Sequence, residues 1–326
     1  METRPELELH QVRINFPRVE LGDLCYMTIS ESIQNYLDYA AFKLKPTSMR
    51  GYDLTLRQFA VFMRDIHIER VTEKDVTEWF HLMRKLNWDH NAIIPKAIAL
   101  RKLFEYHTRR GAKVLDPWFI PVSNKEYKMP RVVSKENFEK LLASIPKNND
   151  PRHIRNRALL LMYWDTVARN SEPLALDMSD LEIDKGQGQA TIKTKKSRGK
   201  RPIRQIFWRK DANDALMAWL EKRSYLAKKT AFRNPEAVFV SCAGGKIGCR
   251  FTNKGVAEML RRYSKLAGLE TVNAHSIRHR GCRDISKLKG ASAVMNIAGH
   301  ASLASSSVYT MLDGDELEEL ARSIHR

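Results

Sequence analysis

The sequence has few cysteines and no long apolar run. Its four cysteines are scattered over 326 residues, and Cys242 and Cys249, the nearest pair, have six residues between them. This arrangement suits neither a disulfide framework nor a common zinc spacing, so we expect Cys25, Cys282 and the nearest pair to be reduced thiols. No apolar stretch approaches the roughly 20 residues that cross a bilayer, and the opening METRPELELHQVRINFP has no apolar signal core. We therefore expect a cytoplasmic protein.

Acidic residues are also scarce relative to basic ones. Asp and Glu number 38 against 56 Lys and Arg, which gives a formal net charge of +18. Hydrophobic residues make up 43%, enough to form proper cores. The positive surplus favours a polyanionic partner, most simply nucleic acid. A basic surface without such a partner is the alternative, and composition does not distinguish DNA from RNA or an acidic membrane.

Apolar periodicity divides the sequence into two mainly helical parts. Residues 1–27 show little periodicity and are expected to form an arm. Four amphipathic helices are predicted within 28–115, the third of them with an N-cap at Thr72. The proline-containing segment 116–133 is predicted to be a linker, and residues 134–326 to form a second domain.

The second domain contains one region of strand character. GQGQATIKT and RPIRQIFW flank the turn KKSRGK and predict a β-hairpin, and AVFVSCAGGKI predicts a further short strand. The fold class expected is thus mainly α with a small β-hairpin or sheet, an α+β domain. Seven basic and no acidic residues lie between Lys193 and Arg204. Such charges are either solvated or lie on phosphates.

The segment HSIRHR raises a choice between zinc and phosphate. His275 and His279 stand four residues apart, a spacing at which one helical turn can hold zinc. A zinc protease helix, however, carries Glu after the first histidine as general base, and here that residue is Ser276. Arg278, a cation between the two histidines, would also repel a metal ion. His275 and Arg278 can instead surround one phosphate.

Other residues can join this pair at a phosphate. Arg169 lies where one predicted helix ends and another begins, Lys193 starts the basic turn, and His300 precedes Tyr309 by nine residues. Each residue alone is unremarkable, because a stray His-x-x-Arg is common by chance. The ordered set of six is specific, and its members are Arg169, Lys193, His275, Arg278, His300 and Tyr309.

At these positions the sequence resembles the tyrosine recombinase family, which includes phage integrases and Xer-type recombinases. The segments that match are VARNSEPLAL, TIKTKKSRGKRPI, HSIRHR, AGH and SSSVYTML. The resemblance extends over some 280 to 300 residues, from the helical bundle to Tyr309. It departs from the family pattern at Val167 and Ala168, where Gly-Leu is customary, and at Pro173. In this family His279 is a packing residue beside the arginine.

The resemblance implies a role for each residue of the set. Tyr309 would be the nucleophile that forms a 3′-phosphotyrosine, and Arg169, Arg278 and His300 would bind the scissile phosphate. His275 would exchange a proton with the tyrosine. Lys193 would protonate the 5′ oxygen, with Lys195 and Lys196 as alternatives. Neither a metal ion nor a cofactor is implied.

The resemblance also implies an assembly. A helical core-binding, SAM-like domain and the catalytic domain would close around double-stranded DNA as a C-shaped clamp. The apolar side of the tail DELEELARSIHR would pack on a neighbouring protomer of a tetramer, or on its own domain. Strand exchange would then pass through a Holliday junction. A type IB topoisomerase-like enzyme and a non-catalytic DNA-binding regulator are the alternatives.

Overall fold

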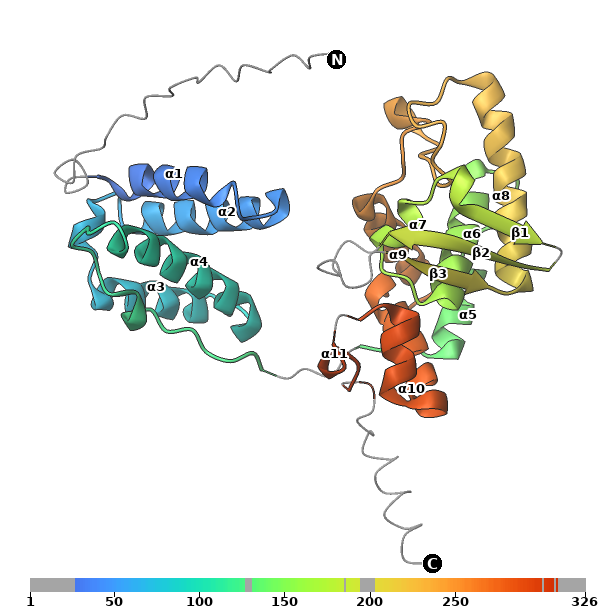
Figure 1. The fold of residues 1–326 in the computed structure, drawn as a ribbon. Helices are drawn as coiled ribbons and strands as arrows, with labels where there is room; N and C mark the ends of the chain where they lie inside the picture. The colour runs from blue at the N-terminus through green and yellow to red at the C-terminus, as the bar shows by residue number, and fades with distance from the viewer. Residues whose placement is uncertain are drawn as a thin grey trace, which may run out of the picture. The chain divides into compact units, whose positions relative to one another are not determined.

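The computed structural model describes residues 27–126, 131–184, 186–193, 203–300, 302–307 and 309. The chain divides into two compact units, residues 1–128 and 129–326 (Figure 1). The division lies inside the predicted linker, and the finer limits of the predicted domains stay predictions. The described residues are mainly helical with one small sheet, which confirms the predicted fold class.

Four α-helices make up most of the described part of the first unit. They are α1 (Ile29–Ala40), α2 (Pro46–Phe62), α3 (Glu73–Lys85) and α4 (His90–Thr108), with the 3₁₀ turns η2 (Ile68–Arg70) and η3 (Pro117–Phe119). A capping box starts α3, because Thr72 and Asp75 accept hydrogen bonds from each other's backbone N–H; this confirms the predicted N-cap. Helix α2 begins at Pro46, since proline fits the first turn of a helix.

The apolar faces of these helices pack against one another as their periodicity predicts. The buried side chains include Ile29, Ile33, Leu37, Leu56, Phe59, Val76, Trp79, Leu100, Leu103 and Phe104. The rings of Phe59 and Trp79 meet edge to face with centroids 5.0 Å apart. Burial of these faces is the main source of the unit's stability.

Part of the predicted linker belongs to this first core. Ile120 is fully buried, and its carbonyl accepts a hydrogen bond from Arg101 Nε at 3.1 Å. Asn91 exchanges hydrogen bonds with the backbone of Glu126 at 3.0 and 2.9 Å. Residues 117–126 therefore pack on α4. The sequence did not predict this packing, because one isolated apolar residue produces no periodic pattern.

The second unit is arranged around helix α6. Its helices are α5 (Lys135–Ala143), α6 (Pro151–Thr166), α7 (Ser171–Leu174), α8 (Lys210–Lys229), α9 (Asn253–Leu266), α10 (Ala274–Ala298) and α11 (Ala304–Ser307), with η4 (Met178–Asp180) and η5 (Gly244–Lys246). The strands are β1 (Leu181–Asp184), β2 (Gln187–Lys193) and β3 (Ile203–Trp208). Helix α6 packs along α8, and the sheet lies against both helices (Figure 1).

The strands form one antiparallel sheet of order β1–β2–β3. The predicted hairpin is confirmed, since β2 pairs with β3 from Gly188 opposite Trp208 to Lys193 opposite Ile203. Its basic tip lies outside the described residues. Strand β1 is an addition that the sequence pattern did not predict.

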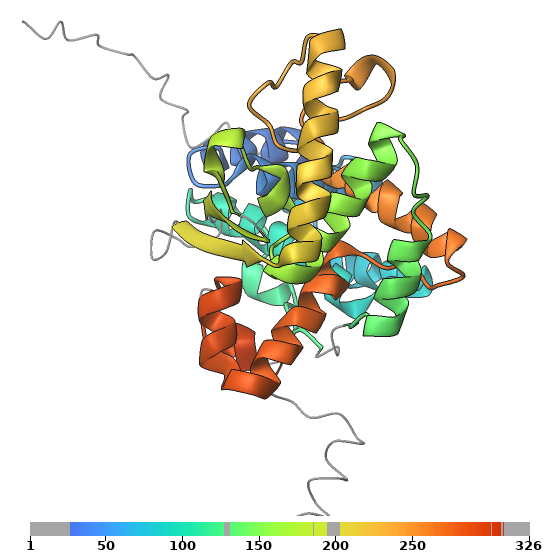
Figure 2. The ribbon, with the colours of Figure 1, turned by 90° about the vertical axis from the view of Figure 1, so that its right-hand side faces the viewer.

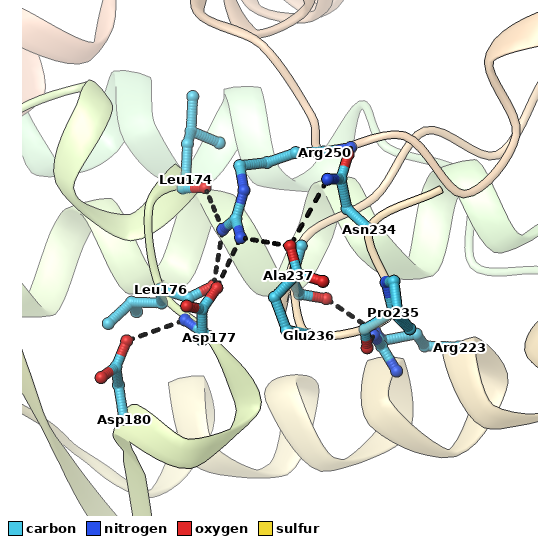
Figure 3. A network of polar contacts seen from close by, with 10 residues as sticks. All are labelled: Leu174, Leu176, Asp177, Asp180, Arg223, Asn234, Pro235, Glu236, Ala237 and Arg250. Atoms are coloured by element: carbon cyan, nitrogen blue, oxygen red, sulfur yellow. Dashed lines mark hydrogen bonds and ion pairs between the residues drawn. The ribbon is translucent and has the colours of Figure 1, made fainter. Parts of the chain in front are cut away.

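The short strand predicted for AVFVSCAGGKI is wrong. In this segment the structure has only isolated bridges, Ala237 with Asp177 and Val240 with Arg250. Single backbone hydrogen bonds, such as the one from Val238 N–H to the Leu176 carbonyl, hold the segment. Arginine side chains add further bonds to it and to its neighbours (Figure 3). Arg250 donates to the carbonyls of Leu174 and Leu176 at 3.2 and 3.0 Å. The apolar run is thus a buried loop tied to the chain that follows α7.

Helix α10 contains a sharp kink. Gly290 has φ 75° and ψ 178°, which interrupts the helix between its two halves, visible as the red segment in Figure 2. Only glycine adopts this backbone region readily. Gly299, with φ 65°, then ends the second half. The kink turns the second half back toward the start of the first.

Candidate active site

The structure describes five of the six predicted site residues with their side chains. Arg169 lies between α6 and α7, His275 and Arg278 lie in the first turns of α10, and His300 follows its last residue. Tyr309 follows α11. Of Lys193 only the backbone is described, at the end of β2, while Lys195 and Lys196 lie outside the described residues.

Val167 shapes the turn that carries Arg169. It ends α6 in the left-handed region, with φ 52°. A β-branched residue there costs about 1–2 kcal/mol in backbone strain. Its carbonyl accepts a hydrogen bond from Arg278 Nη1 at 2.5 Å, and its side chain packs on Gly281. The departure from Gly-Leu therefore keeps the turn, held in place by one of the predicted site arginines.

Glu172 holds Arg169 in place. Its carboxylate accepts from the backbone N–H of Arg169 at 2.7 Å and from Nη1 at 2.8 Å. Arg169 Nη2 donates to the Gly299 carbonyl at 2.5 Å. Burial alone would raise the pKa of Glu172, but Arg204 and Arg169 outweigh it and lower that pKa.

Arg278 is a buried guanidinium whose described partners are neutral. Nη1 and Nη2 donate to the carbonyls of Val167 and Ala298, and only 2% of the residue is exposed. Burial, with Arg169 and Arg204 nearby, lowers the pKa of Arg278, which nevertheless stays protonated. Three guanidinium groups thus surround one carboxylate, and the excess positive charge favours an anion.

Tyr309 lies among the histidines. Its hydroxyl oxygen is 2.6 Å from His279 Nδ1, and its ring stacks on His300 with centroids 5.9 Å apart. The ring centroids of His275 and His279 are 4.3 Å apart. His300 Nδ1 is 2.8 Å from Ser306 Oγ. Of the predicted histidines, His300 therefore contacts the predicted nucleophile, and His275 contacts it through His279, which had been interpreted as packing.

The local environment keeps these groups neutral. Burial first, then neighbouring cationic groups, lowers the pKa of His279 and of His300 to about 4. Burial raises the pKa of Tyr309. A neutral imidazole beside a protonated phenol can accept its proton when Nδ1 is unprotonated. His279 is therefore placed to accept a hydrogen bond from the hydroxyl and to orient it.

A small apolar cluster supports this group from behind. Val167, Cys282, Val294 and Ala298 are buried together, and Tyr309 packs on them. The sequence patterns missed the structural roles of Glu172, Arg204 and His279. Glu172 had a signal, an acid three residues after Arg169, whereas Arg204 was only one cation in a basic run.

Neither a metal cluster nor a membrane helix stands out in the described parts of the chain. No group of three His, Cys, Asp or Glu side chains within them is arranged to hold a metal ion. No described helix is both long and apolar enough to cross a membrane. The segment HSIRHR instead contributes an arginine and two histidines to a cationic site beside a tyrosine.

Comparisons with known proteins agree with this geometry. The sequence model of the phage integrase family matches residues 131–316. The tyrosine recombinase XerC of Alcanivorax borkumensis is 24% identical over 90% of this chain and 94% of its own. XerD of Halalkalibacterium halodurans is also 24% identical, over 91% of this chain and 98% of its own.

A solved structure shares the fold. The XerH site-specific recombinase bound to difH substrate, a pre-cleavage complex, superposes with a TM-score of 0.70 at 21% identity, over 90% of this chain and 95% of its own. The family match alone covers more than half of the sequence. The chain therefore belongs to the phage integrase family and is a tyrosine recombinase, a DNA strand transferase of site-specific recombination.

Proposed function

We propose that Tyr309 is the nucleophile of this recombinase and that Arg169, Arg278 and His300 bind the scissile phosphate. The observation that carries the proposal is that His279 contacts the Tyr309 hydroxyl and His300 stacks on its ring, while Arg169 and Arg278 bind the Gly299 and Ala298 carbonyls just before His300. Glu172 is the carboxylate that orients Arg169. Arginine suits the role because a guanidinium stays protonated and can bind two phosphate oxygens.

In the cleavage step the Tyr309 oxygen attacks phosphorus. The bond from phosphorus to the 5′ oxygen breaks, which leaves a 3′-phosphotyrosine and a 5′ hydroxyl. Lys193 donates the proton to the 5′ oxygen, with Lys195 and Lys196 as alternative donors on the same hairpin. Double substitutions among these three lysines would identify the proton donor, because in a single variant a neighbouring lysine can replace the one that is lost.

The tyrosine proton passes to the pair of histidines on α10. His275 is the predicted partner, and the 2.6 Å contact supports His279 as the group that holds the hydroxyl. The two rings lie in edge-to-face contact, so a proton on one lowers the pKa of the other. The pair therefore takes up one proton in cleavage and returns it in rejoining.

Rejoining needs no external energy source, because the new ester bond between phosphorus and the tyrosine oxygen conserves the energy of the phosphodiester bond that breaks. The 5′ hydroxyl of a second strand attacks it and releases Tyr309, which gives strand exchange through a Holliday junction. Such exchange requires a tetramer on two double-stranded DNA sites. We place the contact between protomers in the tail that contains Leu317, Leu320 and Ile324, outside the described residues, and the reaction in the cytoplasm.

The two alternatives have less support. A topoisomerase-like enzyme would share the adduct but not join two DNA molecules, and a regulator would form no adduct. The relatives described above are named recombinases. These names favour exchange over simple nicking and closing.

Adduct trapping tests the proposal. The protein is incubated with fragmented DNA of its source and quenched with detergent, and DNA that remains attached through phenol extraction is sequenced. We expect adducts at one recurring sequence, absent with Tyr309→Phe although this variant still binds DNA. Adducts that persist in Tyr309→Phe would contradict the assignment, and adducts scattered over sequence would favour the topoisomerase.

A further inference from the structure

Arg204 lies on β3, at the loop end of the hairpin that carries the candidate lysines. It is paired with Ile192 across the sheet, one position before the pair of Lys193 and Ile203. Its side chain does not face solvent. Only 9% of that side chain is exposed, which is unusual for an arginine in a hairpin.

The Arg204 side chain ties β3 to two other parts of the site. Nη2 donates to Glu172 Oε2 at 2.7 Å, and Nη1 donates to the Ile297 carbonyl, near the end of α10, at 2.5 Å. Its aliphatic part lies against Gly299, since a Cβ added to that glycine would be 2.9 Å from Arg204 Cδ. One residue therefore links the hairpin, the Arg169 turn and the segment that leads to His300.

Removal of Arg204 would leave the Arg169 pair in place. Glu172 binds Arg169 through both its backbone N–H and Nη1, without help from Arg204. The link that would disappear is the one between β3 and the phosphate site. The function affected should therefore be the one that the hairpin supplies, which is the proton for the leaving oxygen.

The fit of Arg204 is not the best one for stability. Its Nε is buried and has no hydrogen-bond partner among the described residues. A buried donor without an acceptor costs free energy. A purely structural residue at this position could be apolar, whereas only a forked cation can bond a carboxylate and a carbonyl in two directions.

We propose that Arg204 is a positioning residue for protonation of the leaving group. It fixes the loop end of the β2–β3 ladder against Glu172 and α10, so that a lysine of the hairpin reaches the 5′ oxygen. As the bond from phosphorus to this oxygen breaks, the lysine ammonium gives up one proton and becomes an amine. The inference rests on the proposed function, because it requires attack by Tyr309.

A change of leaving atom separates this role from a structural one. Single-turnover adduct formation is measured on a synthetic duplex of the sequence recovered by adduct trapping, with either oxygen or sulfur at the scissile 5′ position. A thiolate leaves without a proton, because thiols have a pKa near 8.5, far below that of an alcohol. A defect in leaving-group protonation therefore disappears on the sulfur duplex.

We expect Arg204→Ala to form adduct about 100-fold more slowly than the natural protein on the oxygen duplex, the lower end of what a general acid contributes. On the sulfur duplex the two proteins should differ by less than about threefold, a small part of that effect. Arg169→Ala should stay slow on both duplexes, because its loss affects the phosphate itself. Arg209→Ala is the matched control: this arginine follows β3, its side chain is 78% exposed, and it pairs with Asp165 at 2.7 Å.

Three results would overturn the inference. Equal loss on both duplexes would mean that Arg204 acts through Arg169 or through the fold, and no loss on either would mean that it has no role. Absence of any adduct with the natural protein would reject the proposed function and this inference with it. If Arg204→Ala does not fold by circular dichroism, Arg204→Lys replaces it, since a lysine keeps the charge but cannot bond both acceptors at once.

Discussion

The Nδ1 atom of His279 lies 2.6 Å from the hydroxyl oxygen of Tyr309. His275 and His279 are separated by one turn of α10, so both rings project from the same face of this helix. The second histidine of HSIRHR therefore contacts the hydroxyl of the proposed nucleophile. A role for it in catalysis follows from this contact and not from its place in a motif.

Replacement of His279 by Asn should slow adduct formation by about 100-fold, the lower end of the effect of acid–base catalysis, because the hydroxyl loses the member of the proposed histidine pair that orients it. Binding of DNA should change little. Single-turnover cleavage and a gel-shift assay measure the two effects. His153→Asn serves as control, since this histidine lies on α6 and contacts Asn148. Full activity of His279→Asn, with His275→Asn inactive, would leave His275 as the sole acceptor.

Stability should decrease as the solution becomes mildly acidic. His279 and His300 have a pKa of about 4 in the folded protein, against 6.5 as the reference value. The unfolded chain therefore binds protons more readily, so stability is complete above about pH 6.5, falls as pH drops toward about 4, and levels off below it. Urea unfolding between about pH 7 and pH 4.5 measures this loss.

The variant His279→Asn with His300→Asn should show a weaker pH dependence over the same window. Glu172, whose pKa is lowered, contributes its own loss only as pH falls below its reference value of 4.5. The two effects are therefore separable along the pH axis. An unchanged pH dependence in the double variant would show that these histidines do not cause it.

Gly281 and Val167 should behave as a coupled pair. A Cβ at position 281 would lie 2.6 Å from Val167 Cγ2, and the stiff valine side chain cannot move far. Gly281→Ala should therefore cost roughly 1–3 kcal/mol of unfolding free energy, although alanine favours helices elsewhere.

A compensating change tests this coupling. Val167→Gly removes both the methyl groups and the strain at φ 52°, so the double variant should be more stable than Gly281→Ala alone. Chemical denaturation of the four proteins gives the coupling energy. Additive effects of the two substitutions would show that the contact does not matter.

Glu172→Gln should destabilise the protein by about 3–5 kcal/mol, because two guanidinium groups would lose their carboxylate in a buried site. Only 4% of the Glu172 side chain is exposed. Lys210→Ala breaks an exposed pair with Asp214 and should leave stability nearly unchanged. Similar losses for the two variants would mean that solvent reaches Glu172 more freely than its burial indicates.

Local patterns were enough to predict much of the fold and part of the site. The helices of the first unit and the β2–β3 hairpin follow from apolar periodicity and turn chemistry, which depend on neighbouring residues alone. The pairing of Arg204 with Glu172 could not be predicted, because it joins two cations and one acid from separate elements. The contact of His279 with Tyr309 was missed because its place beside the arginine in the motif indicated a packing residue. In the structure, the rotation of residues around the axis of α10 directs its ring toward Tyr309.

The segment around Ala237–Val240 shows the opposite failure. Its apolar run has the composition of a strand, yet it forms a loop. Arg223 donates to the Ala237 carbonyl of this loop, and Arg250 donates to the Leu176 carbonyl in the chain that follows α7 (Figure 3). Composition reports burial, and burial does not distinguish a sheet from a loop whose carbonyls are bonded by side chains. The linker prediction missed Ile120 for a related reason, since a single buried residue produces no pattern.

Arg278 and its acceptor Ala298 are twenty residues apart on one helix, a separation of about 30 Å had α10 been straight. The bend at Gly290 removes that separation. A Cβ added at Gly290 would have no atom within 4 Å, so space alone would allow any residue at this position. The backbone angles of Gly290, however, are ones that only glycine adopts readily. The alignment of arginine, histidine and tyrosine therefore depends on a glycine that touches none of them. In a mutational scan this open position should resemble the catalytic residues more than the surface that surrounds it.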